Sequence, residues 1–335
     1  MKPHYNPRDY LHYGRMLWRN RQRQQVWQRQ FEAAVRNGSF RLAAPAVVTI
    51  IPTETCNLRC PMCNQWGENG YFLNGARQAQ HMDEAQLVKL MRSLSPQTSM
   101  INIHGGEPFT YKHVGTLLEL LREQQFDVLI TTNGTLLERH LEQLAEIKNL
   151  VLLLSIDGDE STHDQIRGLG NFQRSKQGLA GIFERRRQRD LPLPLVVMGF
   201  VVCEWTTDAI DTAYEVAYDL GVFALNYTLR YFMPEAAGLA YEKHLQEHFG
   251  VKSSGAWRGW VAPRHERHDY KPGAAALGRL VRQKRFRPWP PYVFTCRENC
   301  GAVIFKLTSK ITSTSLTTSH ALCHSTGRAS IPMAI

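Results

Sequence analysis

Three cysteines lie within one short stretch of this chain of 335 residues. Cys56, Cys60 and Cys63 follow one another with the spacing CX3CX2C. Three thiolates this close can hold three irons of a [4Fe-4S] cluster, which leaves one iron open to another ligand. The alternative is a structural zinc site, which would need a fourth ligand such as His81 or His104. The spacing therefore indicates a metal centre, and an open iron would take part in chemistry.

The order of the cysteines resembles the cluster loop of the radical S-adenosylmethionine (radical SAM) enzymes. In that family SAM chelates the open iron, an electron from the cluster breaks the sulfonium C–S bond, and the resulting radical takes a hydrogen from substrate. The resemblance implies a [4Fe-4S] cluster on Cys56, Cys60 and Cys63, SAM as the second cofactor, and an electron donor of the flavodoxin or ferredoxin type. It names no catalytic acid or base, because hydrogen abstraction needs none.

Two glycines and a carboxylate follow in the segment His104–Phe109. Glycines let the backbone approach a ligand closely, and the Glu107 carboxylate can accept from a cationic amine. Gly105, Gly106, Glu107 and Pro108 resemble the GGEP motif of the family, which holds the amino group of SAM. In isolation such a sequence is usually only a turn. Its place after an apolar run, about 40 residues beyond the cysteines, favours the binding role.

Polar residues also end the next two apolar runs. The segments around Asn133 and around Ser155 and Asp157 resemble the TNG and SxDG elements of the family, which implies contacts to SAM. We expect Ser155 to contact the carboxylate or the ribose of SAM. Asn133 is equally well explained by an Asn-Gly turn, and Asp157 by capping of the loop that follows.

The stretch His163–Gly168 resembles the HDxxRG motif of the peptide-modifying branch of the family. Arg167 can make a bidentate contact to a carboxylate, or it can form a buried clasp with Asp164 or Asp157. This resemblance favours a ribosomally made peptide or a protein side chain as substrate. The alternatives are radical modification of RNA or of a small metabolite, and a non-catalytic metal-binding protein or inactive truncated maturase.

These motifs are spaced along a regular alternation of apolar runs and amphipathic helical patterns. Strands are expected at 47–51, 100–103, 127–131, 150–154, 195–202 and 222–229, with helices between them. Such alternation predicts right-handed crossovers and a parallel sheet. The pattern alone fits a doubly wound sheet or a partial barrel, and the resemblance favours a partial (β/α)6 TIM-like barrel. Each motif follows the carboxyl end of a strand, where parallel α/β folds gather their sites.

The first 45 residues carry most of the formal net charge of +10, because nine Lys or Arg oppose only two acidic residues there. The segment from Tyr10 to Val35 predicts a basic amphipathic helix that contains Trp18, Trp27 and Phe31. We expect this helix to pack on the barrel by its aromatic face. Contact with RNA or with an acidic peptide is the alternative, so nucleic acid remains a partner to test.

Four regions are expected along the chain. A helical extension (1–45) precedes the barrel (46–233), a bridging region that contacts substrate (234–292), and a remnant auxiliary-cluster region with a Ser/Thr-rich tail (293–335). Cys296, Cys300 and Cys323 resemble an incomplete SPASM or twitch domain, so we expect no complete auxiliary cluster. The last 30 residues hold no aromatic residue. Such a segment predicts disorder and a truncated or frame-shifted end.

The cysteine usage and the hydropathy pattern bear on location. Seven cysteines, three of them crowded as metal ligands, suit a reducing compartment. The sequence has no apolar run of about 18 residues and no signal peptide at its start. We therefore expect a soluble cytoplasmic protein without a membrane span.

Overall fold

A computed structural model gives the structure of the chain. It describes residues 5–38, 44–73, 75, 77–97, 99–230, 233–253, 255–261, 275–276, 279 and 292–295. Cys296, Cys300, Cys323 and the Ser/Thr-rich tail lie outside the described residues, so the statements about them stay predictions. None of the helices in the described ranges is long and apolar enough to cross a membrane.

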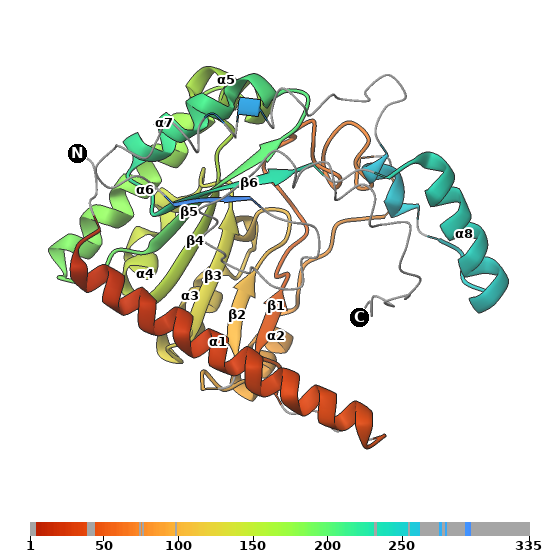
Figure 1. Cartoon of the computed structure of the whole chain (residues 1–335), viewed down its shortest axis with the longest axis horizontal. Helices are drawn as coiled ribbons and strands as arrows, with labels where there is room; N and C mark the ends of the chain where they lie inside the picture. Colours follow the sequence, from red (N-terminus) through yellow and green to blue (C-terminus); the bar gives the residue numbers. More distant parts are fainter. Residues whose placement is uncertain are drawn as a thin grey trace.

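Parallel strands form one open sheet in chain order, as Figure 1 shows. The strands are β1 (Val47–Ile50), β2 (Met100–Ile103), β3 (Asp127–Thr132), β4 (Asn149–Ser155), β5 (Leu195–Val202), β6 (Ala224–Leu229) and β7 (Tyr292–Thr295). Every neighbouring pair is parallel, from Val47 opposite Met100 to Tyr227 opposite Thr295. The predicted partial (β/α)6 barrel is confirmed. The strand β7, which pairs with β6, was not expected from the sequence.

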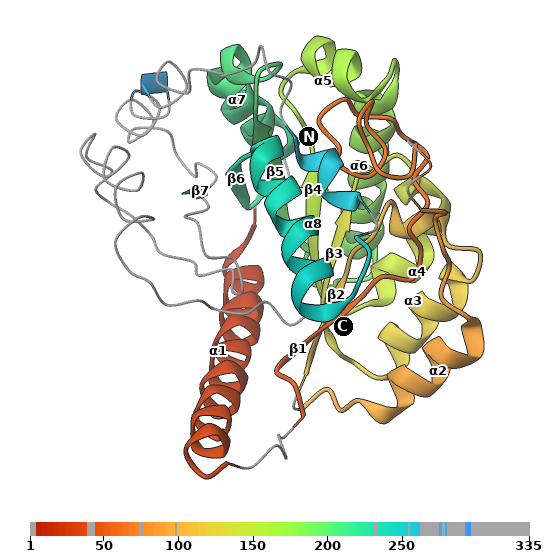
Figure 2. The same ribbon diagram turned by 90° about the vertical axis from the view of Figure 1, so that its right-hand side faces the viewer.

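Helices cover the outer face of the sheet. They are α2 (Glu84–Ser93), α3 (Val114–Glu123), α4 (Leu141–Glu146), α5 (Glu160–Arg167), α6 (Asn171–Gln188) and α7 (Ile210–Leu220), with the 3-10 turns η1 (Pro108–Thr110), η2 (Leu137–His140) and η3 (Thr207–Ala209). Figure 2 shows α2, α3 and α4 side by side along the sheet. The main core lies between these two layers and includes Val128, Leu152 and Leu118. Each fully buried aliphatic side chain contributes about 1.5–3 kcal/mol, so this layer fixes the barrel.

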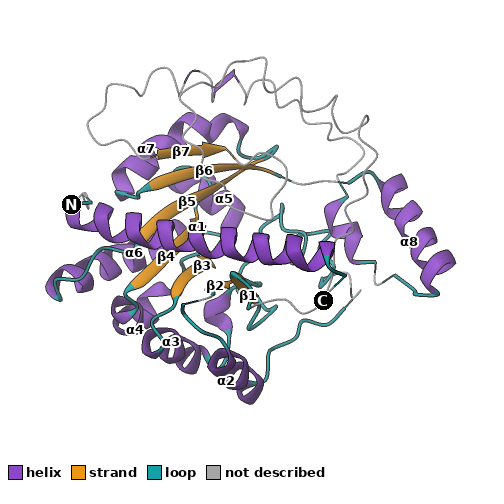
Figure 3. Cartoon of the chain, turned by 60° about the horizontal axis from the view of Figure 1, so that its bottom comes forward, coloured by secondary structure: helices purple, strands orange, loops and turns teal. Residues whose placement is uncertain are grey.

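The basic leader forms a 30-residue helix, α1 (Pro7–Arg36), that crosses the sheet where the strands begin (Figures 1 and 3). The Tyr13 hydroxyl donates to the Leu150 carbonyl oxygen at 3.0 Å, near the start of β4. The helix was predicted correctly, but its contact face was not. The buried residues of the helix include Tyr13 and Met16, whereas Trp18 is 64% exposed and Phe31 is 39% exposed. The helix therefore packs on the barrel through Tyr13 and Met16, while Trp18 and Phe31 face solvent.

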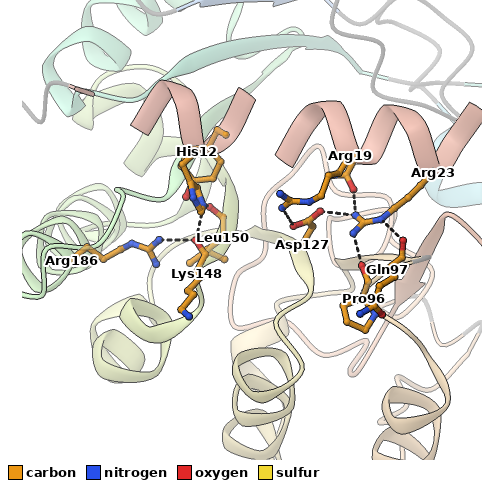
Figure 4. Close-up of polar contacts among 11 residues, drawn as sticks. His12, Arg19, Arg23, Pro96, Gln97, Asp127, Lys148, Leu150 and Arg186 are labelled. Atoms are coloured by element: carbon orange, nitrogen blue, oxygen red, sulfur yellow. Dashed lines mark hydrogen bonds and ion pairs between the residues drawn. The ribbon is translucent and has the colours of Figure 1, made fainter. Parts of the chain in front are cut away.

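Two arginines of α1 bind a buried carboxylate at the start of β3 (Figure 4). Arg19 Nη2 lies 2.9 Å from Asp127 Oδ1, and Arg23 Nη1 lies 2.6 Å from Asp127 Oδ2. Asp127 is only 1% exposed. These two cations of the leader therefore hold the helix on the barrel.

Beyond the barrel, α8 (Glu235–Phe249) and the 3-10 turn η4 (Ala256–Trp260) pack on each other, and α8 stands apart from the sheet in Figure 1. Gly238 is the buried residue of α8, and a Cβ there would lie 2.0 Å from the Trp257 ring. The sequence did not predict α8, because a helix with so small a buried face has no apolar period to recognise.

Candidate active site

The three cysteines lie in the loop that follows β1, at the carboxyl edge of the sheet. Cys60 is buried, and Cys56 and Cys63 are half-buried. The Leu58 amide donates to Cys56 Sγ at 3.4 Å, and the Trp66 amide donates to Cys63 Sγ at 3.3 Å. Amide donors of this kind stabilise thiolate sulfur in iron–sulfur sites. The loop therefore already supplies part of the environment that a cluster requires.

Burial raises the pKa of the Cys56 thiol to about 12 and also raises the pKa of the Cys60 thiol. These groups are therefore thiols at neutral pH, and metal binding would release their protons. Within the described residues, no three His, Cys, Asp or Glu side chains are arranged to hold one metal ion. The cysteines of a four-iron cluster each bind a different iron, so they need not converge on one point.

The histidines considered as a fourth zinc ligand have other surroundings. His81 Nδ1 lies 2.9 Å from the Thr53 hydroxyl, and residues 53 and 81 form an isolated antiparallel bridge. His104 directly follows β2, and burial lowers its pKa. His81 thus helps to hold the start of the cysteine loop.

The Gly105–Gly106 segment lies against the backbone of the cysteine loop. The Gly106 amide donates to the Thr53 carbonyl at 3.2 Å, and the Glu107 amide donates to the Thr55 carbonyl at 2.8 Å. A Cβ at Gly105 would lie 2.3 Å from the Thr53 oxygen, and one at Gly106 would lie 2.2 Å from the Thr55 oxygen. The glycines were expected to admit a ligand. In the structure, the absence of a side chain at both positions allows the backbone of the cysteine loop to pack against them.

Glu107 is buried and joins the ends of β2 and β3. Its Oε1 accepts from the Thr132 hydroxyl at 2.8 Å and from the Phe109 amide at 3.3 Å, and its Oε2 accepts from the Asn133 amide at 2.7 Å. A carboxylate offers about four acceptor positions, so one remains for a ligand amine. Pro108 is buried and begins the η1 turn, which Glu107 caps. Burial raises the pKa of Glu107 to about 7, although these hydrogen bonds act to lower it.

We expect Glu107→Gln to reduce the pH dependence of the stability of the metal-free protein. The pKa of Glu107 is raised from 4.5 to about 7 by folding, so the folded state binds more protons than the unfolded state between these values. The free energy of unfolding therefore falls as pH rises from about 4.5 to 7, by about 3 kcal/mol from this group. Urea unfolding at pH 5 and pH 8 would measure the change.

The exposed Glu138→Gln is the matched control, and it should leave the pH dependence as in the wild type. Equal pH dependence in the wild type and in Glu107→Gln would contradict the expectation. The absolute stability of Glu107→Gln is a separate quantity, because the amide cannot accept all three hydrogen bonds.

Asn133 holds the turn after β3 and contacts the cysteine loop. Its Nδ2 donates to Asn57 Oδ1 at 3.0 Å, and its Oδ1 accepts from the Thr135 amide at 3.0 Å. Its carbonyl accepts from the Ser175 hydroxyl at 2.8 Å. These contacts support the turn interpretation. Any contact of Asn133 to SAM remains a prediction.

Ser155 ends β4, and Asp157 lies two residues beyond it, at the same carboxyl edge of the sheet as the cysteine loop. Ser155 is half-buried, and its hydroxyl has no hydrogen-bond partner among the residues that the structure describes. Asp157 is fully buried, and its Oδ2 accepts from Arg167 Nε at 2.5 Å. Of the two alternatives for Arg167, the clasp with Asp157 is therefore present. The two Nη atoms of Arg167 make no hydrogen bond within the described part of the chain, so a contact to a carboxylate is still open to them.

The HDxxRG stretch forms the second part of helix α5 and its C-cap, Gly168. The sequence did not predict this helix. Asp159 caps it by accepting from the Thr162 amide at 2.9 Å. Asp164 accepts from the amides of Gly170 and Phe172, at 2.6 and 2.8 Å, and so fixes the turn after the helix. Asp164 was the other candidate partner of Arg167. It binds backbone amides instead.

A threonine network next to the cysteines was not anticipated. The Thr110 hydroxyl lies 2.8 Å from the Thr55 hydroxyl and donates to the Thr55 carbonyl at 3.1 Å. The Thr55 amide in turn donates to the Thr53 hydroxyl at 3.1 Å. Threonine is a common residue, so the presence of Thr53, Thr55 and Thr110 in the sequence did not indicate this network. Only the strand register brings the loop after β1 beside the loop after β2.

The sequence profile of the Radical SAM superfamily matches residues 50–213, which include the cysteine loop and the strand ends just described. The chain belongs to the radical SAM superfamily. The family implies an iron–sulfur cluster and SAM as cofactors.

Relatives of this radical SAM protein differ in the activity that their names state. The sporulation killing factor maturation protein SkfB of Bacillus subtilis (strain 168) is 25% identical over 190 residues, which are 56% of this chain and 43% of SkfB. The AdoMet-dependent heme synthase of Methanosarcina barkeri (strain Fusaro / DSM 804) is 30% identical over 199 residues, which are 58% of this chain and 53% of that protein. The chain thus spans about half the length of these relatives.

A solved structure has the same fold as this radical SAM protein. The crystal structure of Streptococcus suis SuiB bound to S-adenosylmethionine aligns with a TM-score of 0.55 and 14% sequence identity. The alignment covers 82% of this chain and 55% of SuiB. At this identity the likeness concerns the fold alone, and it agrees with the partial barrel.

The residues present fit the cofactors of a radical SAM enzyme. His163 is buried and accepts from the Asp157 amide through Nδ1 at 3.2 Å, and burial followed by the nearby Arg167 charge lowers its pKa to about 4. Its Nε2 and Asp157 Oδ1 are buried without a hydrogen-bond partner. A polar ligand could pair with these two atoms, and Asp157 lies close enough to Cys60 for its charge to raise the pKa of that thiol.

Proposed function

We propose that this chain reductively cleaves SAM at a [4Fe-4S] cluster on Cys56, Cys60 and Cys63 and abstracts a hydrogen from an organic substrate. The observation that carries the proposal is the cysteine loop, which lies at the carboxyl edge of the sheet against the Gly105–Gly106 backbone. When bound, the cluster and SAM supply one electron to the sulfonium C–S bond and a radical that takes hydrogen from substrate.

The roles that we assign to the residues follow from their positions. The free acceptor position of Glu107 and the nearby backbone would receive the amine of SAM. The Ser155 hydroxyl and the two Nη atoms of Arg167 would donate to the SAM carboxylate or ribose. Asn133 would act through the turn that it holds, and Asp157 through Arg167. Each contact would fix the reacting C–S bond in one orientation, which is the contribution that a protein makes to such chemistry.

We further propose a peptide or protein side chain as the substrate. The HDxxRG-like helix α5 and the likeness to SkfB, whose name is that of a maturation protein, support this choice. A small-molecule substrate is the rival, since the heme synthase is also similar over 58% of this chain. The electron donor would be a flavodoxin or ferredoxin, and the reducing cytoplasm would suit both the donor and the cluster.

The proposed function can be tested with anaerobically reconstituted protein. A brown protein that absorbs near about 400 nm and holds about four irons per chain is expected. Dithionite and SAM should then yield 5′-deoxyadenosine. A colourless protein, or a brown one that releases no 5′-deoxyadenosine, would contradict the proposal. About eight irons per chain would instead contradict the expectation that no auxiliary cluster forms.

The substrate class needs a separate measurement. Co-expression with small open reading frames that neighbour this gene should change the mass of one encoded peptide, and that change should require Cys60. A mass change in no peptide, together with SAM cleavage that a small metabolite stimulates, would refute the peptide assignment and leave the radical chemistry standing.

A further inference from the structure

One buried ion pair lies beside the cysteine loop. Arg167 Nε and Asp157 Oδ2 are 2.5 Å apart, and their side chains are 10% and 0% exposed. Helix α5 holds the arginine, since its last carbonyl, that of Arg167, accepts from Asn171 Nδ2 at 2.6 Å. Both charges are therefore fixed in place and removed from water.

The same helix packs on the cysteines. Ile166, the neighbour of Arg167, is buried in one apolar cluster with Leu58 and Cys60, and Cys56 and Cys63 pack against that cluster. Burial raises the pKa of the Cys60 thiol, while the Arg167 charge acts to lower it and the Asp157 charge acts to raise it. Cys60, which shares the apolar cluster with Ile166, thus lies near both charges.

A fixed charge in a water-poor site acts strongly on a nearby redox centre. The potential of an iron–sulfur cluster depends on net charge, hydrogen bonds to sulfur and solvent exposure. Reduction adds one electron to the cluster, so a nearby cation favours the reduced form and a nearby anion favours the oxidised form. The proposed effect needs no bond to break and no proton to move at the ion pair.

We propose that the Arg167–Asp157 ion pair sets the reduction potential of the cluster on Cys56, Cys60 and Cys63, with Arg167 raising it and Asp157 lowering it. This inference rests on the proposed function only in that a cluster must bind. It adds an electrostatic role to two residues that would otherwise serve as ligand contacts or as a clasp.

Arg59, within the cysteine loop, provides the control for the proposed effect of Arg167. Its Nη1 donates to the carbonyls of Cys56 and Leu58, each at 2.8 Å, and its guanidinium lies 4.3 Å from the centre of the Trp66 ring. Arg59 is as near to the cysteines in sequence as a cation can be, but it is exposed. Solvent and salt should therefore screen its effect on the cluster.

The experiment is a dithionite-mediated redox titration of the reconstituted full chain without SAM, followed by electron paramagnetic resonance of the reduced cluster. At a fixed potential, Arg167→Gln should lower the ratio of reduced to oxidised cluster about tenfold, which corresponds to 59 mV for one electron. Asp157→Asn should raise that ratio. Arg59→Gln should change it less than Arg167→Gln does, and only Arg59→Gln should lose its effect in high salt.

The opposite signs expected for the two shifts in the ratio distinguish an electrostatic effect from a purely structural one. A clasp whose only role is structural would be broken by both substitutions, so equal shifts in one direction, or loss of the cluster from both variants, would overturn the inference. Arg167→Lys keeps the charge and should keep the ratio near that of the wild type; a ratio like that of Arg167→Gln would also overturn it. A wild-type protein that binds no cluster would instead refute the proposed function.

Discussion

Replacing Cys60 by Ala is expected to abolish cluster binding and the release of 5′-deoxyadenosine. Cys60 is the middle and most buried of the three cysteines, and burial raises the pKa of its thiol. Bound iron would stabilise the thiolate against this burial, and no other side chain of the loop could take the place of Cys60. Iron content should fall from about four atoms per chain to below about one. Iron assays and product analysis by mass spectrometry would check both.

Cys203→Ala is the matched control for this variant. Cys203 is also fully buried, but it follows β5 and its amide donates to the Thr206 hydroxyl at 2.9 Å. It is a small core residue, and its loss should cost about 1 kcal/mol of stability without loss of iron. Wild-type iron content in Cys60→Ala, or loss of iron from Cys203→Ala, would mean that the cluster ligands are wrongly assigned.

The barrel could be predicted from sequence because its strands are continuous buried runs. The strand at Leu195–Val202 was predicted with its observed bounds. Six of its eight residues are buried, which leaves an uninterrupted apolar signal. The helix α5 escaped prediction for the opposite reason. It buries only His163 and Ile166, so its eight residues appear polar and without period.

The amphipathic pattern predicted the position of α1 in the chain, but it did not predict which side of the helix faces the barrel. Tyr13 and Asn20 are buried there, whereas Trp18 is exposed, so residue type was a poor guide to contact. The reason is that polar groups make much of this interface. Leu193 donates its amide to Asp9 Oδ1 at 2.8 Å, and both Arg19 and Arg23 bind Asp127. Such pairs depend on strand register, which no local pattern encodes.

The sequence predicted that the candidate residues follow the strand ends, but it did not predict their contacts. The types and order of Cys56, Glu107 and Arg167 are the basis of the chemistry that we propose. The sequence left two partners open for Arg167, and the structure chooses Asp157 because Asp164 caps the turn after α5. The same limit holds for Gly105 and Gly106. The sequence indicates that another group approaches their backbone closely, but it does not indicate whether that group is a ligand or the cysteine loop.

Gly106→Ala is expected to displace the cysteine loop. The added Cβ would lie 2.2 Å from the Thr55 carbonyl oxygen, 2.5 Å from the Glu54 carbonyl oxygen and 2.6 Å from the Thr55 carbonyl carbon. All three are backbone atoms, so no side chain can rotate away, and the two loops must separate. The Glu107 amide, which donates to the Thr55 carbonyl at 2.8 Å, would lose that bond. We expect a loss of about 3 kcal/mol or more in unfolding free energy, from overpacking and the lost hydrogen bond together.

The same methyl group is harmless elsewhere in the chain. A Cβ at Gly115, in α3, meets nothing within 4 Å, so Gly115→Ala should leave stability unchanged or raise it by up to about 1 kcal/mol. Urea unfolding and iron content, measured on both variants, separate local crowding from a general effect of alanine. Because the glycine segment supports the loop that carries Cys56, Gly106→Ala should also reduce cluster loading. Full loading and wild-type stability in Gly106→Ala would mean that the two loops are not in contact.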